Sequence, residues 1–341
     1  MPPDLHDHAV TVLDPERGPR AAAPCPLCGA VGGRAIFAVE GCASPVVACP
    51  ECGLARLEPL PSDDELARFY PDAYYGDPGI KFQATVEWLV RAVGARHIRF
   101  LARGVPPGGR ILDVGCGRGV LLAELADRGF EVHGVERTAA AALGADPRAR
   151  IRIAPDLAAA GYPPEFFDAV IIWHVLEHLR DPVATVREIG RLLRPGGKLV
   201  VAVPNFSSLQ ARWAGPAWFH LDLPRHLFHF PLRALRRLLE QSGFVFVSEH
   251  HFSLRQNPFG WIQSALNRHA ELPRNGLYTL LHRRPPGETA PFDSATRRRL
   301  LLSGLLRLPL ALLLTVVEAA LRSGATVHVV ARKPGVAKRE A

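Results

Sequence analysis

Apolar segments of strand length recur along the chain from residue 110 onward, and helical segments separate most of them. These segments do not alternate apolar with polar positions, as Ile111–Val114 and Leu199–Val203 illustrate. Strands of this kind are typical of a sheet that helices cover on both faces, so the pattern predicts an α/β fold with a mostly parallel sheet. The predicted strands are residues 111–114, 132–135, 151–154, 169–173, 199–203, 244–250 and 326–331.

The pattern differs before this series and between its last two strands. Residues 62–70 and 82–103 carry apolar residues at helical spacing, which predicts helices that lead into the main domain. Between the last two strands, a polar and Pro-rich part is followed by a leucine-rich part. We therefore expect an insertion over residues 257–321.

The N-terminal part of the chain has a third character. Residues 1–24 are rich in Pro, Ala and charge without periodicity, which predicts a flexible leader. They lack the cationic start and the apolar run of a secretory signal, so a cytoplasmic location is expected. Residues 25–57 contain short apolar runs among Gly, Pro and Cys, and a segment of this size needs a staple such as a metal.

Four of the six cysteines form two C-x-x-C pairs, Cys25 with Cys28 and Cys49 with Cys52, and 20 residues separate the pairs. A glycine follows each pair and lets the backbone turn its amides toward the sulfurs. A reducing compartment favours metal ligation over disulfides, and four thiolates saturate a tetrahedral Zn²⁺. The spacing therefore predicts a structural zinc site, with four unligated thiols as the alternative. Cys42 is a substitute ligand or a plain thiol.

Composition excludes several classes of protein. The 341 residues are 48% hydrophobic and 22% charged, as in soluble globular proteins, so collagen-like, disordered and coiled-coil chains are excluded. Lys and Arg number 41 against 33 Asp and Glu, which gives a net charge of +8. This balance favours anionic partners such as nucleic acid, a phosphorylated ligand or a negative membrane face, unless the arginines are simply scattered over the surface.

Residues 113–119, D-x-G-x-G-x-G, end the first predicted strand and open a predicted helix at residues 120–127. Glycines there allow a ligand to approach the backbone closely at a helix N-terminus. Glu136 lies 17 positions after Gly119, where a carboxylate can accept hydrogen bonds from both hydroxyls of a ribose. A dinucleotide fingerprint needs Gly or Ala where this chain has Val120, so a nicotinamide cofactor is disfavoured.

The loop resembles the cofactor-binding motif of class I S-adenosylmethionine-dependent methyltransferases, and the resemblance extends over residues 110–333. It implies a Rossmann-like, seven-stranded, mostly parallel sheet whose last strand is antiparallel, with S-adenosylmethionine as the cofactor. In that layout, residues 194–197, R-P-G-G, match a late motif that we interpret as a tight turn before the fifth strand. The cofactor-binding residues that the resemblance implies are Asp113, Gly115, Cys116, Gly117, Gly119, Glu136, Asp156 and Trp173.

These patterns predict a division of the chain into five parts. The expected parts are a flexible leader (1–24), a zinc-ribbon-like module (25–60), a helical linker and cofactor cover (61–108), a methyltransferase domain (109–256 and 322–335) and an insertion (257–321).

Methyl transfer from a sulfonium depends on alignment and needs a base only where the acceptor must lose a proton. Two clusters offer such a base. Glu177 and His178 follow the fourth strand, at the edge where open α/β sheets bind ligands. Residues 218–226, W-F-H-L-D-L-P-R-H, follow the fifth strand and map to the same edge. We predict His226, His178 and Glu177 as catalytic residues and favour His226, because Asp222 can orient its imidazole.

Structural interpretations of these clusters stay open: His178 as a capping residue, and residues 218–226 as a lid over the cofactor. Residues 221–226 also resemble the L-D-x-P-R-H signature of bacterial methyltransferases with an N-terminal cysteine knuckle. That group includes relatives that act on sugars and on secondary-metabolite or envelope precursors. Tyr70, Tyr74 and Tyr75 either fold over the cofactor or are ordinary surface or core aromatics.

Arg297–Arg299 precede a leucine-rich run that ends at Leu321. Its longest uncharged piece is ten residues, 308–317, against the roughly 20 that span a bilayer, so the run does not predict a transmembrane helix. A basic cluster beside an apolar helix suits peripheral contact of residues 297–321 with anionic lipid at the inner face of the membrane. Packing against the domain or against a dimer partner is the alternative.

We therefore predict an S-adenosylmethionine-dependent methyltransferase that acts on a small-molecule, sugar or lipid-linked biosynthetic precursor. The alternative is a non-catalytic zinc- and nucleotide-binding protein that recruits nucleic acid or a protein partner. Specific nucleic-acid binding is disfavoured because the basic residues are scattered and do not interleave with aromatic ones. The sequence leaves open the methylated atom, oxygen, carbon or nitrogen, and the oligomeric state.

Overall fold

The structure is a computed structural model that describes residues 10–14, 21–40, 42–67, 100–281 and 292–335. The chain forms two compact units. The sheet unit comprises residues 90–203, 235–249 and 328–341, and the cysteine unit comprises residues 1–89, 204–234 and 250–327. The division predicted from the sequence stays a prediction. Most of the predicted helix 82–103 and the three tyrosines at 70, 74 and 75 lie outside the described residues.

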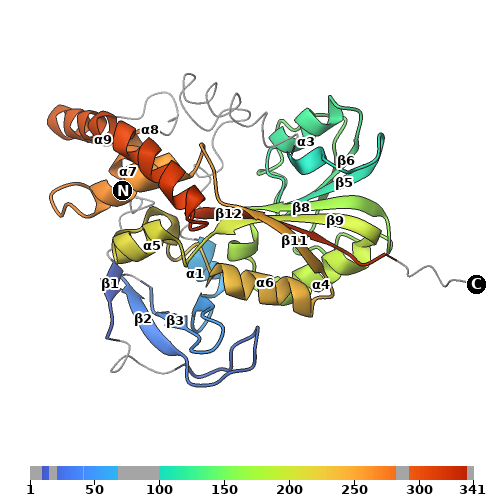
Figure 1. Ribbon diagram of the computed structural model, residues 1–341, viewed down its shortest axis with the longest axis horizontal. Helices are drawn as coiled ribbons and strands as arrows, with labels where there is room; N and C mark the ends of the chain where they lie inside the picture. Colours follow the sequence, from blue (N-terminus) through green and yellow to red (C-terminus); the bar gives the residue numbers. More distant parts are fainter. Residues whose placement is uncertain (1–9, 15–20, 41, 68–99, 282–291, 336–341) are drawn as a thin grey trace, which may run out of the picture. The chain divides into compact units, whose positions relative to one another are not determined.

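A seven-stranded sheet forms the centre of the sheet unit (Figure 1) and confirms the predicted fold class. All seven predicted strands are present, in the spatial order β11-β12-β9-β8-β5-β6-β7. Residues on β5 and β8 are buried at nearly every position, because both faces of the sheet are covered. The strands are β5 (Arg110–Val114), β6 (Glu131–Glu136), β7 (Arg150–Ile153), β8 (Phe167–Trp173), β9 (Leu193–Pro204), β11 (Val245–His250) and β12 (Thr326–Arg332).

The strand order reverses direction at β5. From β5 the chain passes through α3 (Val120–Ala126) to β6 on one side, and from β8 through α4 (Pro182–Leu192) to β9 on the other. Right-handed crossovers in opposite directions place the two helices on opposite faces of the sheet, as Figure 1 shows. The carboxyl ends of β5 and β8 therefore form a topological switch point, where ligands bind in open α/β sheets.

Strand β12 runs antiparallel to β9, as the resemblance implied. The amide of Lys333 donates to the carbonyl of Gly197, whereas the amide of Asn205 donates to the carbonyl of Ala325. Residue numbers therefore rise along β9 as they fall along β12.

The R-P-G-G segment differs from the prediction, because it lies within β9 and not before it. Phe167 pairs with Leu193, and the next paired residue of β8, Ala169, pairs with Lys198, so residues 194–197 form a bulge. The Arg194 guanidinium donates to the Asp168 carboxylate at 2.8 Å. This contact anchors the bulge to the start of β8.

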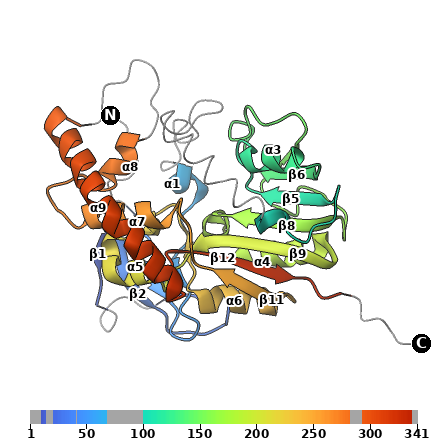
Figure 2. The same ribbon diagram turned by 45° about the horizontal axis from the view of Figure 1, so that its top comes forward.

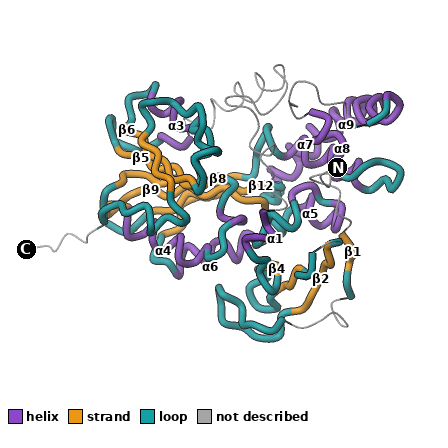
Figure 3. The backbone as a smooth tube through the Cα atoms, turned by 180° about the vertical axis from the view of Figure 1, so that it is seen from behind, coloured by secondary structure: helices purple, strands orange, loops and turns teal. Residues whose placement is uncertain are grey.

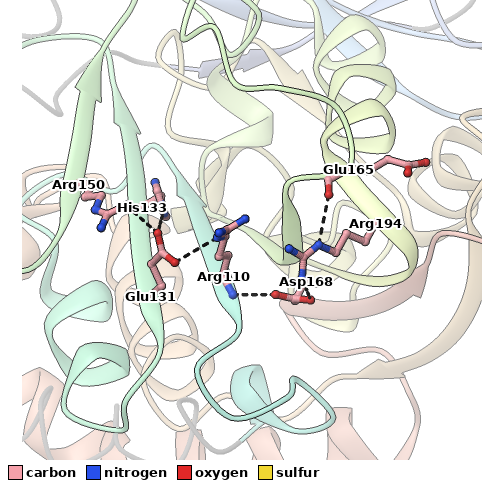
Figure 4. A network of polar contacts seen from close by, with 7 residues as sticks. All are labelled: Arg110, Glu131, His133, Arg150, Glu165, Asp168 and Arg194. Carbon is pink, nitrogen blue, oxygen red and sulfur yellow. Dashed lines mark hydrogen bonds and ion pairs between the residues drawn. The ribbon is translucent and has the colours of Figure 1, made fainter.

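Charged residues link the amino-terminal ends of the parallel strands (Figure 4). Glu131, at the start of β6, accepts hydrogen bonds from Arg110 at 3.1 Å and from Arg150 at 2.7 Å. Asp168 accepts the backbone amide of Arg110 at 2.8 Å. Exposed ion pairs contribute at most about 1 kcal/mol each, so we interpret this edge as structural support for the strands. The opposite edge carries the glycine loop.

The cysteine unit contains a small antiparallel sheet, most of whose strands Figure 3 shows in orange. The predicted flexible leader is wrong at residues 10–12, because Val10–Val12 pair with β2 as an edge strand. At the other edge, Phe228 and His229 pair with β4, a contact that no sequence pattern indicated. The strands are β1 (Val10–Val12), β2 (Arg34–Val39), β3 (Val46–Ala48), β4 (Ala55–Leu57) and β10 (Phe228–His229).

Three helices of the predicted insertion pack together in the cysteine unit (Figure 2) around Trp261, Leu266, Leu277 and Leu300. The longest, α9, continues through Arg307 and Pro309, so its length and composition are those of a membrane-spanning helix. Core helices of soluble proteins have the same length and composition, so the prediction that this run does not span a membrane stays a prediction. These helices are α7 (Asn257–Asn267), α8 (Gly276–Leu281) and α9 (Ser294–Ala320). Further helices within the described residues are α1 (Asp63–Ala67), α5 (Leu209–Ala214), α6 (Leu232–Gln241), η2 (Leu176–His178), η3 (Gly215–Ala217) and η4 (Phe219–Leu221).

Candidate functional site

The glycine loop turns away from β5 at the switch point of the sheet. Gly115, Gly117 and Gly119 have φ values of 72°, 50° and 66°, in the left-handed region that favours glycine. A Cβ added at Gly115 would lie 2.5 Å from a methyl carbon of Val175, so the loop passes against the segment after β8. Around Gly117 no described residue lies within 4 Å of such a Cβ. The loop is therefore closely packed at its start and open in its middle.

Glu136 ends β6 beside this loop. One carboxylate oxygen accepts the backbone amide of Gly117 at 2.9 Å, and the other accepts that of Arg137 at 2.7 Å. A carboxylate has about four acceptor positions, so two more hydrogen bonds can be accepted. Adjacent ribose hydroxyls would supply two such donors. The glycine loop therefore orients Glu136, the residue that we predicted to bind the ribose.

Asp113 lies one residue before the end of β5 and is buried. Burial, with a smaller contribution from the Glu136 carboxylate, raises the pKa of Asp113 to about 8. A cationic ligand at this position would favour the ionised carboxylate. Asp113 is therefore suited to pair with a positive group.

The other predicted cofactor residues occupy different surroundings. Trp173 ends β8, and its ring stacks on His328 with centroids 4.6 Å apart. Asp156 is exposed, and its carboxylate accepts the amide of Ala159 at 2.8 Å, so it caps a turn after β7. Cys116 is partly buried, and burial raises the pKa of its thiol, which disfavours the reactive thiolate.

Glu177 and His178 belong to the short helix η2, just after β8. Glu177 is 1% exposed, and its carboxylate lies 3.4 Å from Nδ1 of His174. His178 is half-buried. Both residues belong to the sheet unit, whereas His226 belongs to the cysteine unit. The surroundings of Glu177 and His178 are therefore given for the sheet unit, and those of His226 for the cysteine unit.

In the cysteine unit, His226 has a defined hydrogen-bond environment. Its Nδ1 lies 3.0 Å from the carbonyl oxygen of His220, so in the neutral ring Nδ1 carries the proton and Nε2 carries the lone pair. A carboxylate oxygen of Asp222 lies 3.7 Å from Nε2. That distance is too long for a hydrogen bond, and the same carboxylate also pairs with Arg225. His226 is thus preset as a proton acceptor at Nε2.

The rest of the 218–226 segment is held by packing and hydrogen bonds. Arg225 pairs with Asp222 through Nε at 3.1 Å and through a second guanidinium nitrogen. Trp218 is 1% exposed, and its indole N–H donates to Gln210 at 3.1 Å, so this ring belongs to the core. The Phe219 amide donates to Ser264 on α7 at 3.0 Å. The imidazole therefore projects from a fixed backbone.

The four paired cysteines lie together. Their Sγ atoms are all within 4.8 Å of one another, with 3.7 Å between Cys25 and Cys52 and 3.5 Å between Cys28 and Cys49. The glycines that follow the pairs both have φ of 74°. Backbone amides of residues 27 and 28 donate to the Cys25 sulfur, and those of residues 51 and 52 donate to the Cys49 sulfur. These amides face the sulfurs as the sequence predicted.

Sequence reasoning missed two residues of these groups. The sequence predicts His328 only as part of an apolar strand, yet its ring stacks on Trp173. The signal that could have identified it is a histidine within the otherwise apolar run T-V-H-V-V-A. The carbonyl of His220 sets the protonation of His226, and no sequence signal identifies a backbone acceptor six residues away.

Comparisons with known proteins agree with this geometry. A family model described as a methyltransferase domain matches residues 86–249. A ubiquinone biosynthesis O-methyltransferase of Xanthomonas axonopodis pv. citri (strain 306) is 38% identical over 115 residues, which cover 30% of this chain and 46% of that protein. A ubiquinone biosynthesis O-methyltransferase of Ruegeria pomeroyi is 29% identical over 240 residues, which cover 60% of this chain and 90% of that protein.

The chain spans about half the length of most curated relatives that it matches. Among solved structures, the chain is similar to phosphoethanolamine N-methyltransferase 2 of Haemonchus contortus bound to S-adenosyl-L-methionine. That structure gives a TM-score of 0.47 at 18% identity and covers 82% of this chain and 62% of that chain.

Proposed function

Because residues 86–249 match a methyltransferase domain model, we propose that this chain is a class I S-adenosylmethionine-dependent methyltransferase that methylates a hydroxyl of a small-molecule, sugar or lipid-linked biosynthetic precursor. The observation that carries the proposal is the switch-point loop with Glu136 hydrogen-bonded to Gly117. The O-methyltransferase names of the relatives support oxygen as the methylated atom.

The residues at the switch point fit the cofactor. Glu136 would hold the ribose through its remaining acceptor positions, and Asp113 would face a cationic group. Trp173 and Asp156 would bound the adenosine end. S-adenosylmethionine supplies an activated methyl group on a sulfonium, so alignment can account for about 7 to 11 kcal/mol of the barrier.

The protein's own contribution to proton transfer would come from His226. A hydroxyl is a poor nucleophile until it loses its proton, and Nε2 of His226 carries the lone pair that can take that proton. The nearby Asp222 carboxylate would stabilise the imidazolium that results. Glu177 and His178 are proposed to assist by orienting groups at the carboxyl edge of the sheet.

The proposal is tested by supplying the purified chain and methyl-labelled S-adenosylmethionine to a cell extract and analysing the products by mass spectrometry. We expect label in one small or lipid-linked molecule, on oxygen. Label on nitrogen or carbon would contradict the hydroxyl assignment. Absence of any labelled product, while the chain still binds S-adenosylmethionine, would contradict the proposed activity on extract metabolites.

We expect Glu136→Ala to weaken S-adenosylmethionine binding by about 1.5 to 3 kcal/mol, because the variant loses charged hydrogen bonds. Isothermal titration calorimetry measures this directly. Glu131→Ala is the matched control, since Glu131 begins the same strand at the opposite edge and should leave affinity unchanged. Equal affinity of Glu136→Ala and the wild type would show that the ribose partner is another residue.

A pH dependence of cofactor binding follows from Asp113. Because its pKa is raised to about 8 in the free protein, binding of a cation below pH 8 requires the carboxyl to release its proton. Affinity should therefore fall as the pH is lowered from 8 to 6.5, by up to about tenfold per pH unit. Calorimetry across that range checks this, and Asp113→Asn should abolish the dependence. A flat profile in the wild type would contradict the pairing.

We also propose that Cys25, Cys28, Cys49 and Cys52 hold a structural Zn²⁺. The support is the cluster of four sulfurs, the amides that face two of them and the absence of a spare ligand position in a four-thiolate shell. Cys42 donates to the carbonyl of Ser44 at 3.6 Å and is not one of the clustered sulfurs. We therefore assign it no metal.

A further inference from the structure

Helix α9 is fixed to the cysteine unit along one side. Its buried residues are spaced three, four or seven apart, so they form a single stripe along the helix. The stripe packs on α7 and α8, and the indole N–H of Trp261 donates to Glu318 at 3.0 Å. The buried residues are Leu300, Gly304, Ala311, Thr315 and Glu318.

The rest of α9 and its C-cap residue expose large apolar side chains. Leu306 is 79% exposed and Leu305 is 65% exposed. Soluble monomers rarely expose a continuous apolar surface of this extent, so the face is expected to meet a partner. The exposed apolar residues are Leu301, Leu302, Leu305, Leu306, Leu308, Leu310, Leu312, Leu313, Val316, Val317 and Leu321.

The charges on this helix are almost all positive. Arg298 and Arg299 are exposed in its first turns, and Arg307 lies midway along it. Its one acidic residue, Glu318, is buried against Trp261. The exposed face of α9 therefore combines leucines with arginines and offers no carboxylate.

A pocket at the start of α9 has the same chemistry. It has a volume of about 470 Å³ and is lined by Leu280 and Leu281 of α8 and by Leu301, Leu302, Arg297 and Arg298 of α9. No described residue accepts a hydrogen bond from the buried Nε of Arg297. An acyl chain with an anionic headgroup matches both the apolar wall and the guanidinium groups.

We propose that the exposed face of α9 docks on an anionic lipid bilayer, with the helix axis in the plane of the membrane. The 27 residues would extend about 40 Å along the surface. The helix does not cross the bilayer, because its buried stripe holds one side of it to α7 and α8. This inference goes beyond methyl transfer and does not depend on it.

Two features favour lipid over a second copy of the chain. An α9 helix from another copy would offer these arginines no exposed carboxylate within residues 294–320, because Glu318 is buried. Anionic phosphates complement the same arginines, and acyl chains complement the leucines between them.

The experiment is flotation of the full chain with vesicles of phosphatidylcholine alone or with 30 mol% phosphatidylglycerol, at low salt. We expect strong binding only with the anionic lipid. Leu305→Gln with Leu306→Gln should lower the partition coefficient at least tenfold, because two apolar side chains leave the acyl region. Arg298→Gln with Arg299→Gln should lower it roughly fivefold per arginine on anionic vesicles only.

The matched control is Leu143→Gln with Val245→Gln, which removes two comparably exposed apolar residues elsewhere and should leave binding unchanged. Sedimentation of each variant without lipid measures the oligomeric state. Equal flotation of the wild type and the leucine variant would overturn the proposal. So would a stable wild-type dimer that the leucine variant converts to monomer, since a second copy would then cover the face.

Discussion

Replacement of His226 by alanine should lower turnover by about 10² to 10⁴ while leaving S-adenosylmethionine affinity almost unchanged. The reason is local: Nδ1 of His226 faces the His220 carbonyl, which leaves Nε2 as the proton acceptor. The variant removes that acceptor and keeps every proposed cofactor residue. Steady-state kinetics and calorimetry on the same preparation measure the two quantities.

The pH profile separates a base from a structural residue. A hydroxyl acceptor ionises by itself at high pH, so the rate of His226→Ala should recover in part as the pH rises. His178→Ala, at the edge of the sheet unit, should retain most of its activity. Full turnover of His226→Ala together with a folded, inactive His178→Ala would reverse the assignment. Equal, undiminished activity of both variants would indicate catalysis by alignment alone.

Removal of the metal should give the second large effect. We expect about one equivalent of Zn²⁺ per chain in protein that is purified without exposure to a chelator. Structural zinc sites bind with roughly 10 to 16 kcal/mol at pH 7, so its loss should unfold the small sheet that contains β2, β3 and β4. Elemental analysis and thermal unfolding, before and after chelation, measure both consequences.

Two comparisons make this test specific. Cys49→Ser should lose the metal, whereas Cys42→Ser should keep it, because the Cys42 sulfur lies outside the cluster. Acidification should release the metal, since protons compete with Zn²⁺ for the thiolates. Less than a tenth of an equivalent in untreated protein would contradict the site, and equal metal loss in both serine variants would contradict the ligand set.

The sequence by itself determined the features that depend on neighbours along the chain. Apolar runs predicted all seven strands of the large sheet. Central strands such as β5 and β8 are apolar on both faces, because both faces are covered. The spacing of Gly115, Gly117 and Gly119 predicted a glycine-rich loop before a helix, and all three glycines have positive φ in the structure. The paired cysteines predicted their own cluster, since each C-x-x-C turn places two sulfurs together.

Only the tertiary structure decided what distant segments do to one another. Phe228 pairs with Arg56 in the small sheet, and no local pattern links a two-residue strand to a partner so far away. Packing buried Trp218 in the core, and the His220 carbonyl fixed the proton on His226. One side of α9 is covered and the other is bare, although leucines occur on both. The periodicity of a segment predicts its secondary structure. Which of its side chains are buried depends on the other segments that pack against it.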